Sequence, residues 1–114
     1  MTFEELPEFE KDLKAIQKKY RTLPEDLLVL KQILSVLPHE RPPFSYLISD
    51  LGINTRVIKI KKMACRSLKG KGVNSGLRMV YAYFPEFHKI IFIELYHKNQ
   101  QELESRERIF RYFG

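Results

Sequence analysis

LRMVYAYF at residues 77–84 and KIIFIELY at residues 89–96, joined by PEFH at residues 85–88, decide the fold of this chain. Both runs are rich in Val, Ile, Phe and Tyr, which favour β-strands because their branched or aromatic side chains pack well on a pleated surface. The proline-containing joint between them is short enough for a hairpin. The sequence therefore predicts two antiparallel strands joined by a hairpin turn.

Two helices are predicted before these strands. Within residues 7–20 the apolar positions recur at steps of four, three and four residues, which is the stripe of an amphipathic helix. Acidic residues and a leucine-rich stretch follow a break and end at Pro38, which predicts a second helix to about residue 37. Residues 2–6 are expected to form a short edge strand, since Pro7 suits the first position of a helix. We expect the helices to form an antiparallel pair.

The rest of the chain adds one strand and one helix to this prediction. Residues 55–64 alternate in part between apolar and basic residues, as expected for a half-buried strand. Residues 38–54 hold three prolines and are interpreted as a long ordered connection. Residues 100–113 mix a few apolar residues with many charged ones, which is typical of a mostly exposed helix. The order β-α-α-β-β-β-α predicts one α+β domain over residues 1–114, with the helix pair packed on an antiparallel sheet.

Composition and charge narrow the classes of function. The chain has 114 residues, one cysteine and three histidines, so it has no internal disulfide and no zinc-ligand pattern. Its acidic start and its lack of a long apolar run argue against secretion and membrane spanning, so we expect a cytoplasmic protein. Residues 1–40 carry six Lys or Arg and eight Asp or Glu, whereas residues 41–114 carry fourteen and six. The basic second part predicts an anionic partner.

Eight basic residues lie between Arg56 and Arg78 inclusive, with no acidic residue among them. Such a cluster attracts phosphates by Coulomb attraction and counterion release, although lysines on a solvated strand edge would give the same pattern without a ligand. The loop at residues 69–76 adds three glycines and an asparagine. Its backbone amides could approach a phosphate, or it could be a plain flexible hairpin loop. It is not a Walker loop, because the spacing GxxxxGK[ST] is absent.

A second candidate cluster, LYHKN, ends the last predicted strand at residues 95–99. The ring of Tyr96 could stack on a base, and the ammonium of Lys98 could hold a phosphate. His97 could move a proton, since imidazole titrates near neutral pH, although most surface histidines have no such role. These side chains together are suited to binding RNA.

The sequence KGKGVNSGLRMVYAY at residues 69–83, followed by IIFIELYHKN at residues 90–99 and a charged last helix, resembles the RelE/ParE superfamily of toxins. These toxins belong to bacterial type II toxin-antitoxin modules, and the resemblance is nearest to the RelE and HigB branches. It covers nearly the whole chain, and the strand that begins with Leu77 and Arg78 is its most specific part. The resemblance implies a RelE-like fold and a ribosome-dependent mRNA endonuclease that needs no metal or other cofactor. It also implies an antitoxin protein that holds the enzyme inactive.

Roles for individual residues follow from the same resemblance. Arg78 takes the place of the family's strand arginine and would bind the phosphate in the transition state. Lys69 and Lys71 take the place of paired basic residues that hold the RNA backbone or help to deprotonate the 2′-OH. The general acid is either His97 or Lys98. The predicted catalytic side chains are therefore Arg78, His97, Lys98 and Lys71, and the predicted RNA contacts are Lys59, Lys61, Lys62, Arg66, Lys69, Tyr96 and Asn99.

Two other functions are compatible with the same sequence. Members of the ParE branch inhibit DNA gyrase and have no nuclease activity, and the fold does not distinguish these outcomes. A noncatalytic basic module that serves a protein partner would carry a similar charge pattern. The tyrosine, histidine and lysine of residues 96–98 favour the nuclease.

Overall fold

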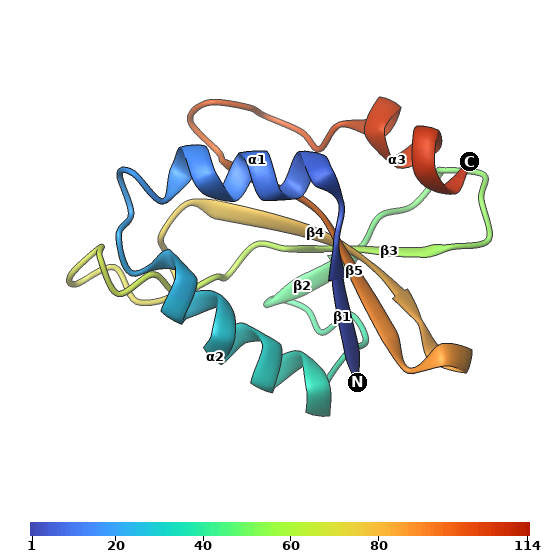
Figure 1. The fold of residues 1–114 in the computed structure, drawn as a ribbon, viewed down its shortest axis with the longest axis horizontal. Coiled ribbons are helices and arrows are strands. Elements are labelled where there is room, and N and C mark those ends of the chain that lie inside the picture. Colours follow the sequence, from blue (N-terminus) through green and yellow to red (C-terminus); the bar gives the residue numbers. More distant parts are fainter.

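The computed structural model describes all residues from Met1 to Gly114. The strands and helices are, in chain order, β1 (Thr2–Glu5), α1 (Pro7–Ile16), α2 (Leu23–Val36), β2 (Ser45–Leu47), β3 (Arg56–Ile60), β4 (Leu77–Phe84), a 3-10 turn (Pro85–Phe87), β5 (Lys89–His97) and α3 (Arg106–Phe113). The five strands form one sheet in the order β1-β5-β4-β3-β2 (Figure 1). The α+β class is confirmed. None of the three helices has the length and apolar character that a membrane crossing requires.

The predicted hairpin forms as expected, but the sheet is mixed rather than antiparallel. β4 and β5 pair in antiparallel fashion, with Leu77 opposite His97 at the open end of the hairpin. At the closed end His88 has a φ of 51°, a left-handed conformation that lets the chain reverse. β1 pairs with β5 in parallel, with Thr2 opposite Lys89. A parallel pair requires a long connection, and here two helices and three strands lie between the partners.

β2 lies inside the segment that was interpreted as a connection. It is antiparallel to β3, with Tyr46 opposite Lys59. The side chain of Ser45 is fully buried and its hydroxyl accepts a hydrogen bond from the backbone amide of Arg41 at 2.9 Å. Three residues are too few to show an alternating pattern, so the sequence did not reveal this strand.

The helices match the prediction in place but differ in length. α1 ends at Ile16, whereas the apolar stripe continues to Tyr20, which is buried in the turn between the two helices. α3 begins only at Arg106, because the side chain of Ser105 accepts a hydrogen bond from the amide of Arg108 and caps the helix there. The residues from 100 to 105 are therefore not helical, contrary to the prediction.

The two faces of the sheet are covered differently. On one face, which we call the helix-pair face, the ring of Phe9 in α1 stacks on Phe92 in β5 with centroids 5.3 Å apart. The other face, which we call the α3 face, meets α3 at one end only, where Phe84 packs against Phe113 with centroids 6.0 Å apart. The opposite end of the α3 face, at the start of β4, has no helix over it.

Alternation along the strands assigns the site residues to a face. Phe84 lies on the α3 face, and every second residue back along β4, through Val80 to Arg78, lies there too. Directly opposite residues of neighbouring strands share a face. Lys59 is opposite Val80 and Tyr96 is opposite Arg78, so both belong to the α3 face.

Candidate functional site

Arg78 is held at the uncovered end of the α3 face by its own strand and by the neighbouring one. Its side chain is half-buried, and Nη1 donates hydrogen bonds to the carbonyl oxygens of Lys61 at 3.1 Å and Leu77 at 3.3 Å. The remaining guanidinium nitrogens have no protein partner. A guanidinium anchored at one nitrogen is preorganised to bind a phosphate through the others.

Two further cations follow the ends of the strands on either side of Arg78. The ammonium of Lys61 is 5.0 Å from the ring centroid of Tyr46, which holds this exposed side chain next to the sheet. Lys98 is exposed, and its backbone amide donates to the carbonyl of Gly76 at 2.9 Å, so the strand pairing continues one residue past β5. Continued alternation places Lys98 on the α3 face, the same face as Arg78.

Lys59 lies on the same face but is already paired. Its Nζ is 2.7 Å from Oε1 of Glu104, and the two side chains are only 12% and 5% exposed. Burial by itself would raise the pKa of Glu104, but the hydrogen bond and the charge of Lys59 lower the pKa below the ordinary value. Lys59 is therefore not a free RNA contact in this structure, in contrast to the prediction.

Tyr96 does not offer its ring to a base. The residue is only 4% exposed, and its hydroxyl is buried without a hydrogen-bond partner. Burial, and then the negative charges of Glu104 and Glu94, raise the pKa of Tyr96 to about 12. The predicted stacking role is wrong because the ring lies in the core, although the hydroxyl group is near the charged residues of the α3 face.

His97 lies on the other face and both of its ring nitrogens are engaged. Nε2 is 3.2 Å from the carbonyl oxygen of Ser75, and Nδ1 accepts a hydrogen bond from the amide of Asn99 at 3.1 Å. The ring stacks on Tyr20 at 6.1 Å and packs so tightly on Gly76 that a Cβ there would be 2.6 Å from Nε2. These contacts are structural, and they correct the prediction that His97 is a candidate general acid.

The basic run is divided by the sheet. Lys62 donates to the side-chain oxygen of Asn74 at 3.3 Å, and the backbone amide of Arg66 donates to the carboxylate of Asp26 on α2. Both basic residues line a mainly apolar groove of about 160 Å³ beside α2, next to Val29. Lys62 and Arg66 are thus on the helix-pair side and do not converge with Arg78, in contrast to the prediction of one RNA surface.

The loop between β3 and β4 carries the other two predicted lysines. Lys69 and Lys71 are both exposed, and neither makes an ion pair. Gly70 and Gly72 have φ values of 77° and 55°, so both use the left-handed conformation that glycine adopts without strain. The roles of these lysines, and of the exposed Asn99, stay predictions.

Glu104 and Glu94 are the site residues that the sequence did not reveal. Both are buried, and both lie among the charged groups of the α3 face. Their burial depends on the path of the chain after β5, which no local pattern indicates. A carboxylate within a strand of apolar residues, as at Glu94, was the one available signal.

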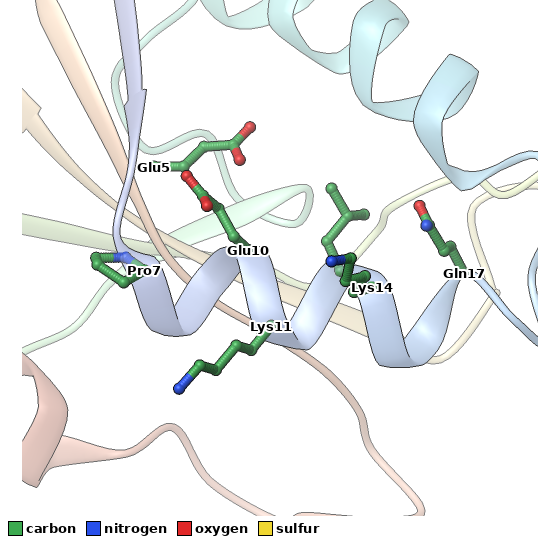
Figure 2. A pocket seen from close by; sticks show the side chains of 7 residues that line it. Glu5, Pro7, Glu10, Lys11, Lys14 and Gln17 are labelled. Carbon is green, nitrogen blue, oxygen red and sulfur yellow. The ribbon is translucent and has the colours of Figure 1, made fainter.

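A second hollow, lined by residues of β1 and α1 and by none of the site residues above, lies along α1 (Figure 2). Glu5 and Glu10 approach it from one side, and Lys11 points away from them. Its lining mixes both charges on an open surface, so it has no set of converging groups. No cluster of His, Cys, Asp or Glu with the arrangement of a metal site occurs in the structure.

No protein-family model matches this sequence, and a search of curated proteins finds no match either. The inference of function therefore depends on the geometry of the α3 face and on the resemblance noted in the sequence.

Proposed function

We propose that this chain is an mRNA endonuclease of the toxin type that binds the RNA backbone on the α3 face. One observation carries the proposal: the guanidinium of Arg78 is anchored through Nη1 and otherwise unpaired, beside Lys61 and Lys98 at the end of the sheet that no helix covers. Three cations at the end of this face that no helix covers favour a polyanion, and the resemblance makes mRNA on the ribosome the substrate of choice.

The reaction needs only groups of the RNA and proton transfers. The 2′-oxygen forms a bond to the adjacent phosphorus, and the bond from phosphorus to the 5′-oxygen breaks, leaving a 2′,3′-cyclic phosphate and a 5′-hydroxyl. The 2′-OH proton passes to water, and the leaving 5′-oxygen takes up a proton. The phosphorane-like transition state carries an additional negative charge, which a fixed guanidinium stabilises. Arg78 takes this role.

Lys98 takes the role of the general acid. It continues the alternation of β5 onto the α3 face, whereas both nitrogens of His97 are used on the opposite face. Lys61 binds the RNA backbone next to the cleaved phosphate. Lys71 is fully solvated in its loop, which suits a contact to a distant phosphate better than proton removal. An antitoxin protein that blocks this face would keep the enzyme inactive.

Mapping of transcript 5′ ends shortly after induced expression tests the proposal. The unmodified chain is expected to create new 5′-hydroxyl ends, and Arg78→Ala is expected to remove them. Arg66→Ala is the matched control, because it deletes an arginine from the same basic run on the other side of the sheet. New ends that persist in Arg78→Ala would contradict the proposal. The absence of ends together with a DNA-damage response would favour a gyrase inhibitor instead.

A further inference from the structure

Residues 99–105, which we call the covering segment, return from the end of β5 to α3 (Figure 1). Glu94 on the α3 face holds this segment down: its two carboxylate oxygens accept hydrogen bonds from the amide of Ser105 and from Nε2 of Gln101, each at 2.8 Å. Val80 of β4 lies between Glu94 of β5 and Lys59 of β3 in the register. Glu104 pairs with Lys59, so the segment also contacts the strand on the far side of Val80. The segment therefore crosses the face on which the site lies.

The contacts of the covering segment are polar rather than apolar. Its one large apolar residue, Leu103, is 62% exposed, so it adds little burial to hold the segment in place. What remains is the pair between Glu104 and Lys59, the contacts to Glu94, and the turn at which the amides of Gln100 and Gln101 donate to the carbonyl of His97. Polar contacts of this kind can be exchanged for contacts with an anionic ligand at small net cost.

Two groups next to the segment would gain from such an exchange. Lys59 would keep an anionic partner if a phosphate replaced the carboxylate of Glu104. The hydroxyl of Tyr96, which is buried without a partner, would gain a hydrogen-bond acceptor. Tyr96 is directly opposite Arg78 in the register, so this hydroxyl belongs to the same row of the sheet as the proposed phosphate-binding arginine.

We infer that Glu104 occupies the place of an RNA phosphate at Lys59, and that RNA displaces the covering segment when it binds. This inference rests on the proposed function and adds to it a second phosphate position, formed by Lys59 and the hydroxyl of Tyr96. In the closed state described by the structure, the carboxylate competes with the substrate for the same ammonium. Opening of the segment extends the RNA-binding surface from Arg78 across the sheet to Lys59.

Binding to purified ribosomes that carry a short mRNA with a 2′-deoxy sugar at the attacking position, which is therefore not cleaved, tests this competition. Glu104→Gln is expected to bind this RNA about 5-fold or more tightly than the matched control Glu102→Gln. Both variants remove one negative charge from the same segment, but Glu102 is exposed and has no partner. An equal gain in the two variants would overturn the inference, as would a gain that persists when Lys59→Met is added to Glu104→Gln.

Hydrogen exchange on the unmodified chain tests the same inference without any substitution. Saturation with the uncleaved RNA is expected to speed amide exchange in residues 99–105, while the amide of Lys98 stays protected by its bond to Gly76. If the RNA binds in a manner that depends on Arg78 but these amides stay as protected as before, the opening of the segment is refuted and the proposed function is not. If RNA fails to bind, or Arg78→Ala binds it equally well, both proposals are overturned.

Discussion

The two sides of the sheet receive cations from one basic stretch of sequence but place them in different surroundings. On the α3 face, Lys61 and Arg78 lie at an uncovered strand end. On the other side, Lys62 and Arg66 border a mainly apolar groove beside α2. A run of charge in a strand is thus not one surface, because consecutive side chains leave a strand in opposite directions. The comparison predicts that matched substitutions on the two sides have unequal effects.

The largest difference is expected between the two arginines. Arg78→Lys keeps the charge but loses the planar fork, so the rate of RNA cleavage should fall about 100- to 1000-fold. Arg66→Lys should leave the rate unchanged, because Arg66 contacts the other side through its backbone amide. Single-turnover cleavage with each purified variant measures both rates. Equal losses in the two variants would show that the sheet does not divide the basic run in function.

The two lysines should differ in stability. Lys59→Met leaves the buried carboxylate of Glu104 with only the longer ion pair to Arg106 at 3.9 Å, which should lower the free energy of unfolding by about 3 kcal/mol. Lys62→Met removes a lysine whose one contact is a long hydrogen bond to Asn74, so the change should stay within about 0.5 kcal/mol. Urea unfolding of the variants measures the difference. Similar values for the two lysines would contradict the buried pair.

Substitutions of His97 and Lys98, at the end of β5, should affect different properties: the first should lower stability and the second should lower the cleavage rate. His97→Gln should keep the cleavage rate and lower the free energy of unfolding by about 1 kcal/mol, because a hydrogen bond on the helix-pair face is weakened. Lys98→Gln should keep stability and lower the rate, because the general acid is lost. Cleavage assays and thermal unfolding of both variants check this pair. A loss of rate in His97→Gln alone would restore the histidine as the acid.

The smallest effect is expected for the pH dependence of the contribution that Glu104 makes to the free energy of unfolding. The pKa of Glu104 is lowered in the folded chain, since Lys59 outweighs the opposing effect of burial. A lowered pKa contributes stability that is fully present above the ordinary value of 4.5 and is lost as pH falls through the folded value. The difference in unfolding free energy between the unmodified chain and Glu104→Gln should therefore be constant at neutral pH and shrink below pH 4.5. A difference that persists in strong acid would contradict the assignment.

Patterns within one element predicted most of the fold. The β4–β5 hairpin and the starts of the two helices appear where the sequence indicated. The strand before the basic loop also forms, but it ends at Ile60 instead of residue 64. The parallel pairing of β1 and the three-residue β2 were not predicted, because each depends on a distant strand and neither has a periodicity of its own. Local propensity carries little information about such pairings.

The candidate site was predicted less completely for a related reason. Arg78 and Lys98 were identified by residue type and resemblance. The register places Arg78 on the α3 face, and the backbone pairing of Lys98 with Gly76 continues β5 beside it. Alternation in residues 95–98 also separates His97 from its two neighbours, so this part was available from the sequence. The burial of Tyr96 and the ion pair of Lys59 could not be predicted from the sequence. Both depend on the segment after β5, which folds back over the sheet and brings Glu104 to Lys59.

The parallel pair of β1 and β5 has a consequence for how the chain is made. Residues 2–5 are synthesised well before residues 89–92, which are their hydrogen-bonding partners. Contacts so distant along the chain form slowly and only after the intervening segments are in place. A nascent chain therefore has no finished sheet until β5 has left the ribosome.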